Sequence, residues 1–162
     1  MRSGKPVYYW DSCLFLAWVK DENRAPGEME GLAEVVAMVD AGECFILTSV
    51  MTRGEVLDSS LTVEAQEKFR SLFSNPVFTF ADVSLPISEV ASQIRDFYKG
   101  QKPQPMSVKL PDATHLATAI AYREVDEFQT FDADDLLRFN GNVAGYKLKI
   151  CNPSAVQKQL FT

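Results

Sequence analysis

Four acidic residues stand where a carboxylate is well placed for chemistry: Asp11, Glu55, Asp112 and Asp132. Asp11 and Asp132 each follow a short run of strand-forming residues. Glu55 lies in a helix predicted after the second strand, and Asp112 opens another predicted helix. Carboxylates that share one crevice repel one another unless a positive charge lies between them. A hard divalent cation prefers oxygen ligands, so these residue types favour Mg²⁺ or Mn²⁺ as the occupant.

A cation held in this way is suited to phosphodiester cleavage. It polarises the phosphate, lowers the pKa of a bound water and stabilises charge on the leaving oxygen. Zinc would instead favour His or Cys ligands, and His115 is the only histidine in the chain. Spacing alone does not decide between a site and a coincidence, because 22 acidic residues always place a few carboxylates at the ends of elements.

The elements that would position these carboxylates alternate between strand and helix. Strands are predicted at 7–10, 44–47, 77–80, 127–131 and 147–151. Helices are predicted from a Ser12 cap to Lys20 and at 28–40, 50–57 (capped by Thr48 and Ser49), 63–73, 88–98, 111–122 and 135–139. This alternation predicts a three-layer α/β/α sandwich around a central parallel sheet of four or five strands. Ligands bind such sheets beyond the carboxyl ends of the strands, where Asp11 and Asp132 lie.

Composition indicates one ordinary globular domain over residues 1–162. The chain is 46% hydrophobic, enough for a substantial core. No stretch approaches the roughly 20 apolar residues of a membrane helix, and the N-terminus lacks a secretory pattern, so a cytoplasmic location is expected. Cys13, Cys44 and Cys151 are odd in number and widely spaced, which predicts buried packing residues and no disulfide framework.

Charge is unevenly distributed along the chain. The net charge of −6 argues weakly against nucleic-acid binding. However, the stretches 97–111 and 136–162 contain no acidic residue and carry Lys99, Lys102, Lys109, Arg138, Lys147, Lys149 and Lys158. Two interpretations stay open: a basic rim beside an acidic centre, or solvated charges scattered over the surface.

Four segments together resemble the PIN-domain family, and their nearest branch is similar to the VapC-type toxins. They are VYYWDS at 7–12, TSVMTRGEV at 48–56, LPDATHLATA at 110–119 and QTFD at 129–132. The resemblance covers nearly the whole chain, with the segments in order and at suitable intervals.

This resemblance implies an activity and a set of site residues. It places Asp11, Glu55, Asp112 and Asp132 in one catalytic, metal-binding site. It implies Mg²⁺- or Mn²⁺-dependent ribonuclease cleavage of RNA, inhibition by a small antitoxin protein, and a homodimer. An antitoxin that places an Arg or Lys among the carboxylates would replace the cation.

Several polar neighbours have two interpretations each. His115 lies one helical turn after Asp112, and a packed helix histidine is favoured over a general base. Asp134 and Asp135 either cap the next helix or join the site. Ser12 and Thr130 either orient carboxylates or only cap and turn the chain.

Two rival functions use similar sheets or keep the same fold. An aspartyl phosphatase needs Asp-x-Asp after the first strand, whereas this chain has Asp11-Ser12-Cys13. A receiver domain needs a phosphoacceptor at the end of the third strand, and Asp82 fits that role poorly. A catalytically silent PIN-like binding module is the other alternative, and the presence of all four acids argues against it.

Overall fold

The computed structural model describes residues 4–154, which build one parallel sheet of five strands in the order β3-β2-β1-β4-β5. The strands are β1 (Val7–Trp10), β2 (Phe45–Ser49), β3 (Phe78–Ala81), β4 (Glu127–Gln129) and β5 (Ile150–Cys151). Every pairing is parallel, and Tyr9 of β1 lies opposite Leu47 on one side and Phe128 on the other. The predicted central parallel sheet is therefore confirmed.

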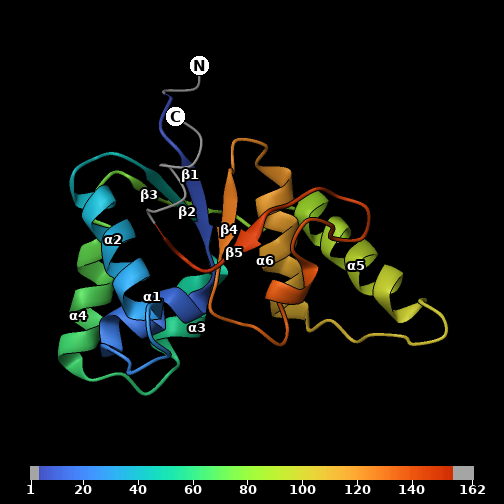
Figure 1. Cartoon of the computed structure of the whole chain (residues 1–162), viewed down its shortest axis with the longest axis horizontal. Helices are drawn as coiled ribbons and strands as arrows, with labels where there is room; N and C mark the ends of the chain where they lie inside the picture. The colour runs from blue at the N-terminus through green and yellow to red at the C-terminus, as the bar shows by residue number, and fades with distance from the viewer. Residues whose placement is uncertain (1–3, 155–162) are drawn as a thin grey trace.

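Helices cover both faces of this sheet, as the three-layer prediction requires (Figure 1). On one side lie α1 (Ser12–Lys20), α2 (Glu28–Asp40), α3 (Met51–Leu57) and α4 (Val63–Leu72). On the other side lie α5 (Leu85–Lys99) and α6 (Leu110–Ala121), and a short 3-10 helix, η1 (Leu137–Phe139), precedes β5. No helix within residues 4–154 is long and apolar enough to span a membrane.

Alternating side chains of β1 divide the core into two parts. Tyr8 and Trp10 pack with the α1–α4 side, whereas Tyr9 packs with the α5–α6 side. This follows from the period of two along a strand, which sends successive side chains to opposite faces. The Trp10 indole is fully buried and donates to Gln129 Oε1 at 2.8 Å, so this tryptophan is a core residue.

Chain order changes direction beside β1, which places the ends of two strands that are far apart in the sequence next to each other. The strands β2 and β3 extend the sheet on one side of β1, and the chain then crosses to β4 on the other side. The carboxyl ends of β1 and β4 are therefore neighbours at a topological switch point, where open α/β sheets bind their ligands. Asp11 follows β1, and Thr130 and Asp132 follow β4.

Some predicted boundaries were wrong, for local reasons. Ser12 is the first residue of α1 and not its cap, because Asp11 takes the N-cap position. Thr48 and Ser49 end β2, and Val50 takes the N-cap position of α3, although Ser49 Oγ does accept from the backbone N of Met51, the first residue of that helix, at 3.2 Å. The Thr48 hydroxyl instead donates to Trp10 O at 2.7 Å. The helix α5 begins three residues earlier than expected, because Ser84 caps it through Ile87 N.

Candidate metal centre

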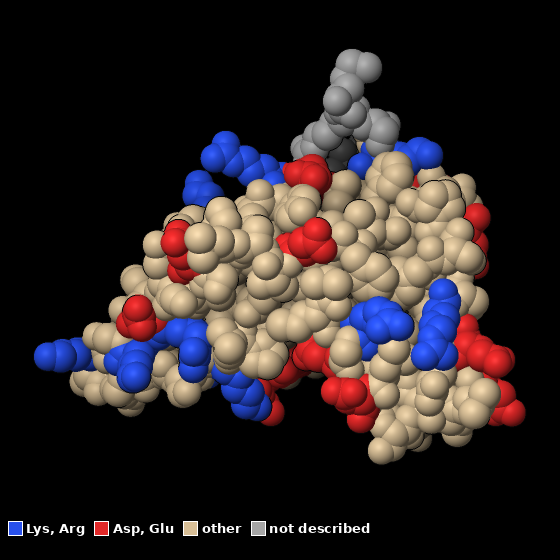
Figure 2. Space-filling model, turned by 180° about the vertical axis from the view of Figure 1, so that it is seen from behind, with Lys and Arg blue, Asp and Glu red and all other residues tan. Residues whose placement is uncertain are grey.

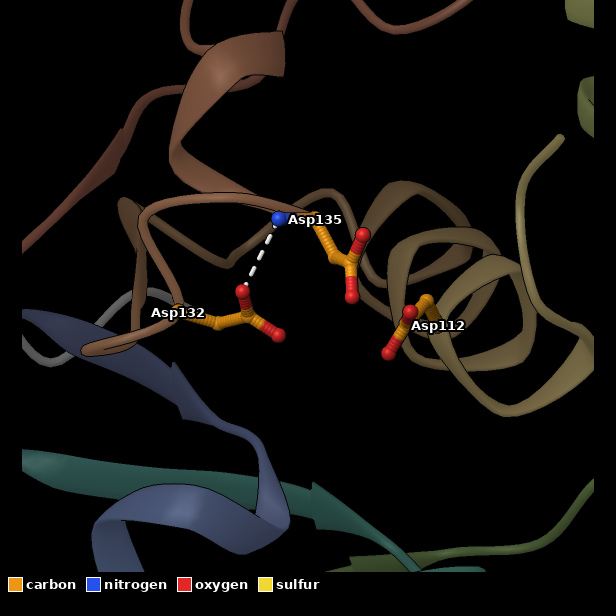
Figure 3. Close-up of side chains that lie close together, drawn as sticks. All are labelled: Asp112, Asp132 and Asp135. Atoms are coloured by element: carbon orange, nitrogen blue, oxygen red, sulfur yellow. Dashed lines mark hydrogen bonds between the residues drawn. The ribbon is translucent and has the colours of Figure 1, made fainter. Parts of the chain in front are cut away.

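Three carboxylates meet where α6 begins and where the chain leaves β4. Each of Asp112, Asp132 and Asp135 offers an oxygen that lies within 4.8 Å of those offered by the other two. The three side chains, which we call the aspartate trio, point toward one another (Figure 3). Asp132 is tied to the turn itself, because its Oδ1 accepts from the Asp135 backbone N at 2.9 Å.

Burial and the charges of the other two carboxylates both act on Asp112. Partial burial, followed by the negative charges of Asp132 and Asp135, raises the pKa of Asp112 from 3.8 to about 6, and nearby His115 opposes this rise. A cation between the three carboxylates would relieve the repulsion. The donor set consists of carboxylate oxygens, which fits a hard divalent cation such as Mg²⁺ or Mn²⁺.

Asp11 is buried behind the trio and held by two hydrogen bonds. The Thr130 hydroxyl donates to Asp11 Oδ2 at 2.7 Å, and the Cys13 thiol donates to Oδ1 at 2.9 Å. Burial raises the pKa of Asp11, while His115 and these two bonds lower it, and the charge of Asp132 adds to the rise. Thr130 also accepts from the Asp132 backbone N at 3.0 Å, so one hydroxyl links both aspartates. The structure thus shows both of its possible roles: Thr130 orients the Asp11 carboxylate and turns the chain at Asp132.

Glu55 projects from α3 and is held by residues of α1 and α6. Its Oε1 lies 2.7 Å from His115 Nε2, and its Oε2 accepts from the Ser12 hydroxyl at 3.4 Å. Ser12 therefore also contacts a carboxylate. His115 is buried, as expected for a packed helix histidine, but its other ring nitrogen, Nδ1, bonds the Tyr9 hydroxyl at 2.6 Å.

The four residues singled out in the sequence are thus divided in the structure. Asp112 and Asp132 lie in the trio, whereas Asp11 and Glu55 lie outside it and are linked to the same region through Thr130 and His115. Asp135 completes the trio, although its role stayed open in the sequence. The run of acids at 132–135 offered several candidates, and only the packing of this turn against α6 distinguishes Asp135 from exposed Asp134.

The predicted basic rim is partly neutralised by ion pairs. Lys109 Nζ lies 3.2 Å from Asp135 Oδ2, and Lys149 Nζ lies 2.8 Å from Glu127 Oε1. Figure 2 shows acidic side chains gathered at a notch in the lower edge of the molecule, with basic side chains on either side. Lys158 lies outside the described residues. Of these two pairs, only Lys109–Asp135 lies at the acidic edge, because Glu127 begins β4 and Lys149 precedes β5 at the opposite edge of the sheet.

Known structures match this arrangement of elements, although no family model and no curated protein sequence matches the chain. A toxin–antitoxin complex from Klebsiella pneumoniae superposes with a TM-score of 0.58 at 22% identity, over 87% of this chain and 99% of that one. VapC20 of Mycobacterium tuberculosis, a toxin that cleaves the sarcin–ricin loop, gives a TM-score of 0.55 at 15% identity, over 78% and 91%. The chain has the VapC-type PIN fold. At these identities the likeness establishes the fold, and the expected PIN-like architecture is confirmed.

Proposed function

We propose that this chain is a Mg²⁺- or Mn²⁺-dependent endoribonuclease and the toxin of a toxin–antitoxin pair. One observation carries the proposal: a trio of converging aspartates, one with its pKa raised to about 6, lies at the carboxyl edge of a VapC-type PIN fold. Strained acidic groups of this kind are typical of functional sites. The two similar structures are a toxin–antitoxin complex and an RNA-cleaving toxin, which supports the same activity here.

The proposed site residues are Asp11, Glu55, Asp112 and Asp132, and we add Asp135. The trio would hold the cation directly, while Asp11 adds negative charge from its buried position and, through Thr130, fixes the backbone of Asp132. A bound divalent cation would supply Lewis-acid chemistry at the scissile phosphate and activate water. The carboxylates would orient that water. Without the cation, their negative charge would repel the phosphate of the RNA.

Positive groups around the acidic edge are proposed to guide the RNA backbone. Lys109 is largely exposed and lies against Asp135, one side chain away from the proposed cation. Arg95 and Lys99 line a hollow of about 380 Å³ between α5 and the segment 105–108. Phosphates are attracted to such groups over several ångströms, and the attraction weakens as salt rises.

The proposed partner is a small antitoxin protein, and the proposed assembly is a homodimer in the cytoplasm. An antitoxin Arg or Lys placed among the trio would form charge-assisted bonds with the same oxygens that the cation needs. Inhibition and loss of the cation would then be one event. The toxin–antitoxin complex among the similar structures supports a protein partner for this fold.

Cleavage of a structured RNA by the purified chain tests the proposal. We expect cleavage with Mg²⁺ or Mn²⁺, none with excess EDTA, and a loss of at least about 100-fold in Asp112→Asn, beyond the 10–100-fold typical when only a supporting hydrogen bond is lost. The matched control is Asp134→Asn, because Asp134 belongs to the same acidic run but is exposed and outside the trio. Equal activity in the wild type and Asp112→Asn would refute the proposed role of the trio.

A further inference from the structure

A line of hydrogen bonds runs from β1 through α6 and ends on Glu55 of α3. The Tyr9 hydroxyl lies 2.6 Å from His115 Nδ1, and His115 Nε2 lies 2.7 Å from Glu55 Oε1. Tyr9 is fully buried and His115 is 2% exposed. Hydrogen bonds formed away from water are electrostatically stronger and costly to break, so this line is a rigid connection.

The direction of the bond to Glu55 follows from the carboxylate, which can only accept. His115 Nε2 therefore donates to Glu55 Oε1, and Nδ1 bonds the Tyr9 hydroxyl, whose oxygen also accepts from the Ser49 backbone N–H at 3.2 Å. When Nδ1 accepts, Nε2 carries the ring proton and donates it to the Glu55 carboxylate.

Glu55 is consequently held more firmly at one oxygen than at the other. Oε1 has the short bond to His115, whereas Oε2 accepts from Ser12 at 3.4 Å, beyond the usual length of an O–H···O bond. The imidazole cannot turn freely, because it also packs edge-on against the Tyr9 ring with centroids 5.8 Å apart. A free glutamate would rotate about three side-chain bonds, and here that freedom is removed before any ligand arrives.

We propose that His115 is a positioning residue: braced by Tyr9, it fixes one oxygen of Glu55 and thereby keeps the other for the divalent cation. This inference rests on the proposed function, because it gives Glu55 the role of a cation ligand. His115 itself is not a ligand, since both of its ring nitrogens are already bonded. The two roles considered from the sequence, packing and catalysis, therefore combine: the histidine acts through Glu55 because it is packed.

Mn²⁺ affinity of the full chain, measured by titration calorimetry, tests this role without an activity assay. His115→Leu removes the donor and Tyr9→Phe removes its brace, so both should raise the Kd for Mn²⁺ by about 10–100-fold, as is typical when a ligand loses its supporting bond. His115→Gln keeps an N–H that can reach Glu55 and should restore most of the affinity. The control is Tyr98→Phe, which removes another buried tyrosine hydroxyl, bonded to Ala144 N at 2.9 Å away from the trio, and should leave the Kd unchanged.

A double-mutant cycle separates positioning from a general loss of structure. In a Glu55→Gln background the trio remains, and His115→Leu should have little further effect on the Kd, because the residue through which it acts has been altered. A structural role would instead weaken Mn²⁺ binding by the same factor in both backgrounds. If Leu at position 115 prevents folding, Tyr9→Phe carries the same cycle, since it conserves the ring.

The outcomes for this role and for the proposed function can be told apart. A wild-type chain that binds no Mn²⁺ at millimolar concentration overturns both. A wild type that binds Mn²⁺, with unchanged affinity in His115→Leu and Tyr9→Phe, overturns the positioning role and leaves the cation site standing. Equal losses with and without Glu55 also overturn the positioning role, whereas losses confined to the intact Glu55 background support it.

Discussion

The fold places the carboxylate of Asp112 where its ionised form is unfavourable. Asp112 is half-buried next to two other carboxylates, which raises its pKa to about 6. Buried aspartates with a purely structural role usually have a cationic or hydrogen-bonding partner. Clustered carboxylates with a raised pKa are instead typical of functional sites. At the residue level, the raised pKa of Asp112 supports the proposed cation site.

The pKa of Asp112 predicts a particular dependence of stability on pH without metal. Because the folded pKa is raised from 3.8 to about 6, the favourable contribution of the protonated group is complete below about 4 and is lost as the pH rises through about 6. Asp112→Asn lacks this loss. We expect the variant to be more stable than the wild type at pH 7 and the difference to shrink toward pH 4, measured by urea unfolding in EDTA. A difference that stays constant with pH would contradict the raised pKa.

Residue type and position in the sequence identified some of the candidate site residues but could not distinguish others. Asp112 and Asp132 were found from their places at element ends, and the structure brings them together. Asp135 could not be separated from Asp134, because the distinction depends on how the turn after Asp132 packs against α6. The bond between His115 and Glu55 joins residues 60 positions apart, and no spacing rule in the sequence reports such a contact.

Secondary-structure elements bring the functional groups together through the ends of two central strands. Side-chain periodicity and turn residues predicted nearly every strand and helix, because these signals are local. Two of the wrong boundaries involve a hydroxyl with a tertiary contact, because Thr48 bonds the backbone of β1 and Ser12 contacts Glu55. The third, the start of α5, depends on a local cap by Ser84. The order of the strands, and hence the proximity of β1 and β4, is a property of the assembled sheet.

Thr130 is the link between these two strand ends, and its removal should be measurable. Thr130→Val conserves shape but leaves buried Asp11 without its 2.7 Å bond, which should cost about 1–3 kcal/mol of unfolding free energy. Thr130→Ser keeps the hydroxyl and serves as the control, with a much smaller loss expected. Denaturant unfolding at neutral pH checks both, and equal losses in the two variants would show that the hydroxyl is not what matters.

The chain as a whole combines an acidic edge, flanking basic groups and exposed apolar side chains. Leu85 and Leu110, in the first turns of α5 and α6, are more than half exposed. Apolar residues in such positions are common at protein interfaces, which agrees with the proposed homodimer and antitoxin. Sequence alone could not locate them, because exposure depends on the packing of α5 and α6.

If the antitoxin replaces the cation, inhibition of RNA cleavage and release of Mn²⁺ should occur together. A candidate antitoxin is titrated into the Mn²⁺-loaded chain, and free Mn²⁺ is measured by electron paramagnetic resonance. Mn²⁺ should be released in proportion to the loss of RNA cleavage. Light scattering at micromolar concentration should show a dimer before the partner is added. Inhibition with Mn²⁺ retained would contradict the cation-replacement mechanism, and a monomer would contradict the dimer.

Anomalous diffraction from crystals soaked in millimolar Mn²⁺ is the most direct test of the proposed site. We predict a manganese peak among Asp112, Asp132 and Asp135, in direct contact with carboxylate oxygens, as hard divalent cations prefer. The same peak should be absent from crystals of Asp112→Asn. A map with no manganese at the aspartate trio, or with manganese bound only elsewhere on the molecule, would contradict the assignment of this edge of the sheet as the catalytic metal site.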